Sequence, residues 1–238
     1  MLEQHRQPRK GRPPMSETVI TVQGRFSAYY PPERATLFLG VHLEGGNRDG
    51  VFSATNESAD LVRGRITGAH DRASGPITWW SSDNVQIWTE KPWNANGLQL
   101  DPVFHAQIGF TVKFSDFVHL ARFVEDVVPI PGVTVDHIEW TLTETSRLGA
   151  LAEVRSRAVK DSVAKATVYA QSIGLGAVRA IALADEGMLS DLSPRAGQGQ
   201  SATDLRPGTA SGSAGPELSL KPEDIEIAAV IDARFLAT

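Results

Sequence analysis

The segment VFHAQIGFTVKF, residues 103–114, decides the fold, because apolar side chains recur at every second position along it. One set consists of Phe104, Ala106, Ile108, Phe110, Val112 and Phe114, and the alternate set of Val103, His105, Gln107, Gly109, Thr111 and Lys113. Successive side chains of a β-strand point to opposite faces of the sheet, so the segment is predicted to be a strand with one buried face.

Turn residues and hydrophobic periodicity divide the rest of the chain into further strands and three helices. Strands are predicted at 18–26, 35–43, 77–80, 85–89, 133–142, 177–184 and 224–236, and helices at 49–69, 116–128 and 147–173. Ser115 or Asp116 is expected to cap the second helix, which stops at Pro129. The order, taken as β-β-α-β-β-α-β-α-β-β, indicates an α+β fold of antiparallel sheets with helices packed on one face of each.

The third helix is the longest, and Gly174 is the expected C-terminal cap. Its predicted buried stripe consists of Leu148, Leu151, Ala152, Val159, Val163, Ala166, Ala170 and Ile173.

Composition excludes several classes of protein. The 238 residues include no cysteine, which removes disulfides, thiolate catalysis, iron–sulfur clusters and cysteine-ligated zinc. The formal net charge is −5, which argues against a general nucleic-acid-binding protein, because phosphate contacts need a concentrated basic surface. No stretch approaches the roughly 20 apolar residues of a membrane-spanning helix.

Two segments are predicted to lie outside the folded core. Residues 1–16 are predicted to be a disordered basic leader, with Met1 or Met15 as the native start. They lack the apolar region of a secretory signal, so a cytoplasmic location is expected. In 190–216, 17 of 27 residues are Gly, Ser, Ala or Pro, which predicts a flexible insertion. The folded domain is expected to extend over 17–238.

Several local patterns, in their order along the chain, resemble the SIMPL-domain family, also called the domain of unknown function 541. They are Ile20–Gly24 (ITVQG), Pro32–Glu33, Leu39–Val41 (LGV), Phe110–Phe114 running into Asp116–Phe117, Ile138-x-Trp140-x-Leu142, and the long helix from Arg155 through Tyr169–Ala170 to Gly174–Gly176 and Glu186. Glu33 stands where the family usually has Asp. The resemblance covers about residues 17–236.

The resemblance implies an α+β protein without an agreed enzymatic reaction, so it supplies no catalytic residues to transfer. It also implies homo-oligomers, since some members form large rings, and a link of some bacterial members to oxidative-stress tolerance. Many members are exported to the bacterial periplasm or envelope.

Searches for catalytic and metal-binding patterns give no site. The six histidines lack ligand spacing, HExxH and GxSxG are missing, and Gly174-Leu175-Gly176 follows a helix where a phosphate loop would precede one. His137 and Glu139 share a strand face, but a third ligand is not in evidence, so a satisfied surface pair is favoured. No catalytic, cofactor-binding or metal residue is therefore assigned.

The tryptophans are the candidate interaction residues: Trp79, Trp80, Trp88 and Trp93, which cannot all point inward. Core packing against the 116–128 helix is an equally good interpretation, and a carbohydrate or nucleobase platform is a weaker one.

The leading hypothesis is a non-enzymatic, self-assembling scaffold or stress-related interaction protein. The alternative is a small-molecule or peptide binding module with a Trp-lined cleft between the helices and the strands. An unrecognised hydrolase is a third class, which would need a His and a carboxylate or hydroxyl brought together from distant segments, for example His105 with residues of the 133–142 strand.

Overall fold

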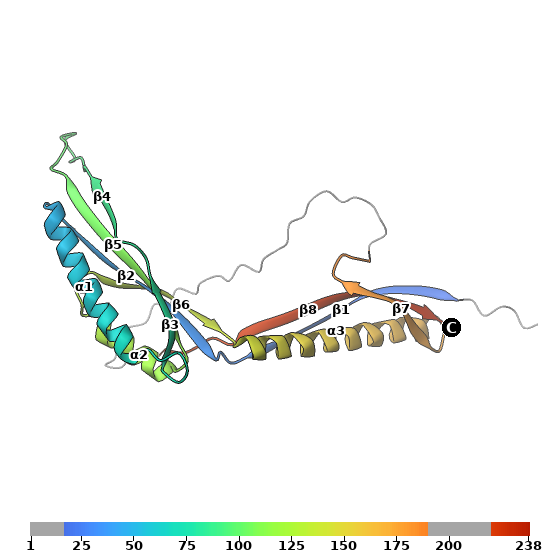
Figure 1. Ribbon diagram of the computed structural model, residues 1–238. Helices are drawn as coiled ribbons and strands as arrows, with labels where there is room; N and C mark the ends of the chain where they lie inside the picture. Colours follow the sequence, from blue (N-terminus) through green and yellow to red (C-terminus); the bar gives the residue numbers. More distant parts are fainter. Residues whose placement is uncertain (1–16, 190–219) are drawn as a thin grey trace, which may run out of the picture. The chain divides into compact units, whose positions relative to one another are not determined.

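A computed structural model describes residues 17–189 and 220–238, which form three helices and two antiparallel sheets (Figure 1). The elements are β1 (Thr18–Tyr30), β2 (Arg34–Gly45), α1 (Arg48–Ala69), β3 (Ile77–Ser82), β4 (Gln86–Glu90), β5 (Val103–Phe114), α2 (Phe117–Val127), β6 (Val133–Thr141), α3 (Glu144–Ser172), β7 (Val178–Asp185) and β8 (Ile225–Ala237).

The α+β class is confirmed, and the order of elements is corrected by one strand. Three strands, β3, β4 and β5, lie between α1 and α2, where the expected order counted two. The two short segments at 77–80 and 85–89 are both strands, and each pairs with β5. They occupy successive parts of the same β5 edge, since β3 pairs with Phe110–Phe114 and β4 with Val103–Gln107.

The described residues divide into two compact units. Unit 1 comprises 17–28, 148–189 and 226–238, and unit 2 comprises 29–147 and 220–225. From the sequence, a single domain was expected over 17–238. The predicted leader, 1–16, and the predicted insertion, 190–216, lie outside the described residues.

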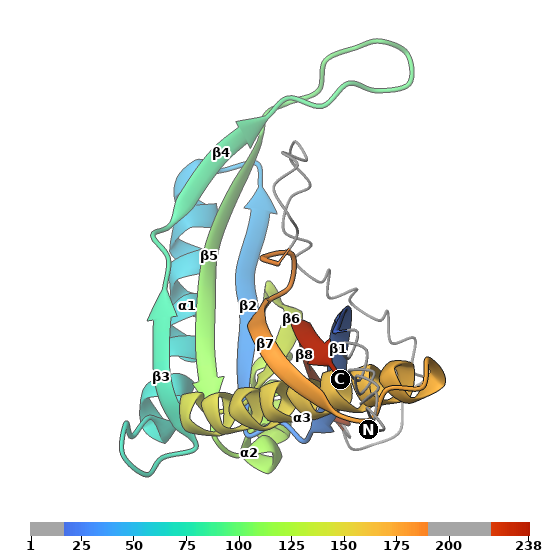
Figure 2. The same cartoon turned by 90° about the vertical axis from the view of Figure 1, so that its right-hand side faces the viewer.

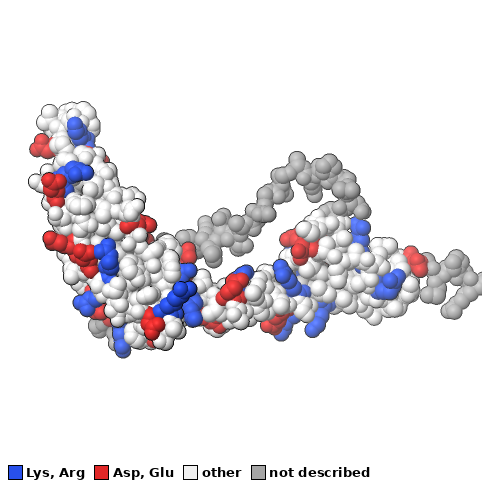
Figure 3. Space-filling view, viewed as in Figure 1, with Lys and Arg blue, Asp and Glu red and all other residues white. Residues whose placement is uncertain are grey.

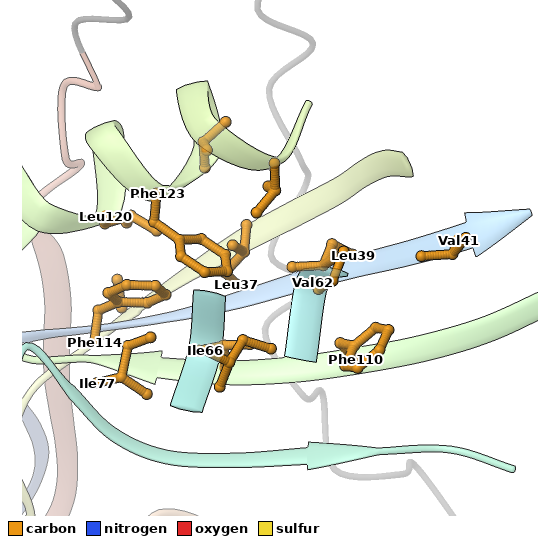
Figure 4. Close-up of a cluster of buried hydrophobic side chains, with 14 of the residues drawn as sticks. Leu37, Leu39, Val41, Val62, Ile66, Ile77, Phe110, Phe114, Leu120 and Phe123 are labelled. Carbon is orange, nitrogen blue, oxygen red and sulfur yellow. The ribbon is translucent and has the colours of Figure 1, made fainter. Parts of the chain in front are cut away.

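Unit 2 is a five-stranded sheet with α1 and α2 on one face. β2 lies between β5 and β6, and Figure 2 shows α1 behind β5 and β2. The alternation predicted for 103–114 is confirmed from Ala106 to Phe114: Ala106, Ile108, Phe110, Val112 and Phe114 are all at most 2% exposed. The last four of these meet Leu37, Leu39, Val62, Ile66, Leu120 and Phe123 in one cluster (Figure 4). Burying each of the larger of these side chains contributes about 1.5–3 kcal/mol.

Both helices of unit 2 begin at a side-chain cap. Asn47 accepts a hydrogen bond from the Gly50 N–H, and Asp116 accepts from the Val118 and His119 N–H groups. Asp116 was one of the two predicted caps. Hydrogen bonds from the His119 backbone and side chain lower the pKa of Asp116 and so favour its charged form. At the N-cap position, this negative charge lies at the positive end of the α2 dipole.

Unit 1 is the three-stranded sheet β1-β8-β7 with α3 along one face. The buried residues of α3 are small and recur every fourth position: Ala150, Val154, Ala158, Ser162, Ala166 and Ala170. A Cβ on Gly24 of β1 would lie 2.1 Å from the Ala158 carbonyl oxygen. The helix therefore approaches the strand too closely for any side chain at Gly24.

This close approach corrects the predicted stripe. Of its eight residues, Ala166 and Ala170 are buried, whereas Leu148, Val163 and Ile173 are 54%, 40% and 58% exposed. Large apolar side chains do not fit where the helix backbone nearly touches the sheet, so the small residues take the contact. The predicted cap is confirmed: Gly174 has φ +81°, and its N–H donates to the Gln171 carbonyl.

None of the three described helices combines the length and apolar character that spanning a membrane requires. The cytoplasmic location stays a prediction. Acidic and basic side chains are interspersed on the surface shown in Figure 3.

Candidate functional site

The helix-free face of the unit 2 sheet carries the candidate site. Because side chains alternate along β2 and β5, the residues that do not enter the core all project to this face. From β2 they are Arg34, Thr36, Phe38, Gly40, His42 and Glu44, and from β5 they are His105, Gln107, Gly109, Thr111 and Lys113. We call this surface the open face.

Two glycines lie directly opposite each other at the middle of the open face. Gly40 of β2 pairs with Gly109 of β5. A Cβ on Gly109 would meet the Asp83 carboxylate at 2.6 Å, and the Asp83 N–H donates to the Gly109 carbonyl. The glycine at 109 thus provides the space in which the Asp83 carboxylate lies. On either side of this pair the open face carries a different group of side chains.

The first group is an aromatic stack of His42, Trp88 and His105. The His105 ring centroid lies 5.1 Å from that of Trp88, with 7° between the planes, and Trp88 lies 5.5 Å from His42. His42 Nε2 and His105 Nδ1 are 3.3 Å apart, so one imidazole donates a hydrogen bond to the other. His105 is buried, although it lies on the face that carries no helix.

Two carboxylates flank this stack. Glu44 lies 3.4 Å from His105 Nδ1, and Glu90 lies 3.6 Å from His105 Nε2. Nε2 is buried, and no hydrogen-bond partner is within reach among the described residues. A histidine and two carboxylates from β2 and β4 therefore do converge on His105, a convergence of the kind that the hydrolase hypothesis requires. None of them comes from the 133–142 strand, which that hypothesis gave as its example. The hydrogen bonds of the described residues link neither imidazole to a hydroxyl that could act as a nucleophile.

The second group surrounds a hollow of about 630 Å³ at the other end of the open face. Arg34, Thr36, Phe38, Thr78, Trp79, Thr111, Lys113, Glu139, Thr141, Leu142, Thr143 and Glu144 line it. The hollow is open to solvent and contains polar, charged and aromatic side chains. This volume falls in the range of about 300–1,000 Å³ found for small-molecule sites.

Glu33 anchors the wall of this hollow. Its carboxylate accepts hydrogen bonds from the Thr143 hydroxyl and N–H, at 2.6 and 2.8 Å, and from the Ser146 hydroxyl at 2.7 Å. The Thr143 hydroxyl, followed by the Ser146 hydroxyl, lowers the pKa of Glu33 to about 2. The acid of the Pro32–Glu33 pair thus fixes the turn that precedes α3, a role that sequence reasoning missed.

The candidate tryptophans occupy different environments. Trp79, Trp88 and Trp93 are 46%, 40% and 66% exposed, whereas Trp80 packs against the core cluster of unit 2. Trp79 lines the hollow, and Trp88 belongs to the histidine stack. The alternative hypothesis placed its cleft between the helices and the strands, but that space is filled by core side chains. The hollow lies on the opposite face of the sheet.

The predicted His137–Glu139 pair is present on β6, with 3.8 Å between His137 Nε2 and a Glu139 carboxylate oxygen. His137 also stacks on Phe38 at 4.3 Å between centroids. Across the described residues, no three His, Asp or Glu side chains are grouped so that they could hold a metal ion. The open face offers ion pairing, stacking and hydrogen bonding, which are the contacts of a binding surface.

The chain was compared with known proteins. The family model SIMPL, described as a protein of unknown function (DUF541), matches residues 20–235. The match includes strands and helices of both units. No curated protein matches the chain.

Proposed function

Since this chain belongs to the SIMPL family, whose function is unknown, we propose that it is a non-catalytic interaction protein that assembles with copies of itself. The observation that supports this proposal is the apolar surface of unit 1. Seven large apolar side chains there are between 46% and 58% exposed: Val19, Leu148, Val168, Tyr169, Ile173, Ile181 and Leu183. Such residues are favourable at an interface, because association removes them from water.

The strand order of unit 1 supports the same proposal. In a three-stranded sheet, β1 and β7 are both edge strands, and each leaves one row of backbone groups without a neighbouring strand in the described residues. Exposed strand edges favour pairing with another chain, and oligomerisation is one way to cover them. On α3, Tyr169 and Ile173 lie one turn apart and present an exposed apolar face.

Size-exclusion chromatography with light scattering tests the assembly. We expect the wild-type chain to be larger than a monomer at micromolar concentrations, and Ile173→Lys to shift the distribution towards monomer. Leu61→Lys is the matched control, because Leu61 of α1 in unit 2 is also 58% exposed. The control should keep the wild-type mass. A wild-type chain that stays monomeric at every concentration would disprove the proposal.

Ligand binding is the second candidate function, and the hollow beside Trp79 favours it. The stress-related role implied by the resemblance stays a prediction, which a deletion strain challenged with peroxide would test.

A further inference from the structure

The register of unit 2 aligns four side chains of different chemistry across the open face. Thr36 of β2 pairs with Glu139 of β6 on one side and with Lys113 of β5 on the other. Lys113 in turn pairs with Trp79 of β3. An acid, a hydroxyl, a cation and an indole therefore form one row in the floor of the hollow. Arg34 lies two positions before Thr36, diagonal to Lys113, where long side chains are within reach of each other.

The two cations of this hollow form no salt bridge within the described residues. The Arg34 guanidinium donates to the Glu33 carbonyl at 2.8 Å. Its charge adds to the Thr143 and Ser146 hydrogen bonds that lower the pKa of the Glu33 carboxylate. Of the two acids on the lining, Glu144 pairs with Arg147, and a Glu139 carboxylate oxygen lies 3.8 Å from His137 Nε2. Arg34 and Lys113 are therefore the cations of the hollow that remain available to an anionic group.

The number of acids limits the charge of that anion. Glu139 and Glu144 line the same hollow as Arg34 and Lys113, so a doubly charged phosphate would meet two negative charges as well as two positive ones. A carboxylate carries a single charge, and its two oxygens match the planar fork of an arginine.

The aromatic side chains add a second requirement. Trp79 is 46% exposed, and the Lys113 ammonium lies 5.1 Å from its ring centroid. Phe38 forms another part of the lining. A ligand whose charged group lies at Lys113 would place the rest of its structure against an indole face, where a flat ring stacks favourably.

We propose that this hollow binds a small aromatic carboxylate, with the carboxylate held by Arg34 and Lys113 and the ring against Trp79. The hydroxyls of Thr36 and Thr111, on the same floor, are placed to complete the hydrogen bonds of the carboxylate. This inference rests on the second candidate function, ligand binding, and is independent of the assembly proposal.

Equilibrium dialysis of the full chain against indole-3-acetate tests the inference, and it works whatever the oligomeric state. The matched probe is indole-3-acetamide, which keeps the ring and lacks the charge. We expect saturable binding of indole-3-acetate at concentrations up to about 10 mM. Binding of indole-3-acetamide should be at least about tenfold weaker. Acetate, which has no ring, should bind more weakly than indole-3-acetate as well.

Three variants and one control locate the ligand. Arg34→Gln and Lys113→Gln should each weaken binding of indole-3-acetate about tenfold, whereas Lys160→Gln, which removes a cation of α3 in unit 1, should leave it unchanged. Trp79→Ala should weaken the binding of indole-3-acetate and should not change the binding of acetate.

Two results would overturn the inference in different ways. Equal binding of the amide and the acetate would retain ligand binding and reject the carboxylate class. Absence of saturable binding, or binding unchanged by Lys113→Gln in a variant with wild-type circular dichroism, would reject the hollow as the site.

Discussion

Substitution of Gly24 by alanine is expected to destabilise unit 1 more than the addition of one methyl group usually does. The new Cβ would lie 2.1 Å from the Ala158 carbonyl oxygen and 2.9 Å from the Ser162 Cβ, whereas real Cβ atoms essentially never come within 3.0 Å. The Ala158 oxygen belongs to the backbone of α3, so it cannot move aside as the end of a flexible side chain would. The helix and the strand must separate instead.

The magnitude follows from that separation. To restore 3.0 Å, β1 and α3 must part by about 1 Å, and a gap of 0.5–1 Å forfeits a quarter to a half of each dispersion contact. The loss extends along the buried residues of α3, beyond the site of substitution. We expect a loss of about 3 kcal/mol in the free energy of unfolding, at the upper end for overpacking. At about 1–3 kcal/mol per molar urea, the midpoint falls by about 1–3 M.

Urea unfolding followed by far-UV circular dichroism and by tryptophan fluorescence measures this effect. All 5 tryptophans lie within 29–147, so fluorescence follows unit 2, whereas circular dichroism also follows α3. Gly149→Ala is the matched control, because it makes the same chemical change at an exposed position of α3. Nothing lies within 4 Å of the new Cβ there. It should stabilise the chain by about 0.5–1 kcal/mol. Wild-type stability in Gly24→Ala, or a shift of both variants in the same direction, would refute the reasoning.

Three further predictions concern unit 2. The pKa of Glu33 is lowered to about 2 from 4.5, so its carboxylate stabilises the fold above about pH 4.5 and this contribution is lost as the pH falls towards 2; Glu33→Gln should lower the urea midpoint at pH 7, with the difference from wild type shrinking in acid. Leu37→Ala should cost about 2–5 kcal/mol in urea unfolding, because Leu37 is completely buried; a cost below 1 kcal/mol would contradict the packing. Trp80→Ala should cost about 2 kcal/mol or more and the exposed Trp79→Ala under about 1 kcal/mol, and an inverted order in thermal unfolding would show that the assignment of the two rings is wrong.

The fold of unit 2 could be predicted from local sequence because its patterns are periodic. In β5, strict alternation separates a core face from an open face, and the structure reproduces that division from Ala106 to Phe114. Asp116 and Gly174 mark helix ends through local chemistry, a side-chain acceptor in one case and a left-handed backbone in the other. Features of this kind depend on residues a few positions apart.

The candidate site could be predicted only in its parts. Trp79 and Trp88 were singled out, but their partners depend on strand register: Lys113 pairs with Trp79, and His105 with Trp88. Sequence spacing contains no information about which residue of one strand lies opposite which residue of another. The histidine stack and the hollow were therefore out of reach, as was the role of Glu33, which binds Thr143 across 110 positions.

The sequence by itself determined the α+β class, most element boundaries and the two faces of β5, because hydrophobic periods and caps act locally. The tertiary structure alone decided which face of α3 is buried. Hydrophobicity favours Leu148 and Ile173, but the sheet approaches α3 so closely at Gly24 and Ala158 that only small side chains fit there. Steric fit between segments distant in sequence outweighed hydrophobicity, since two backbones in near contact leave no volume for a larger group.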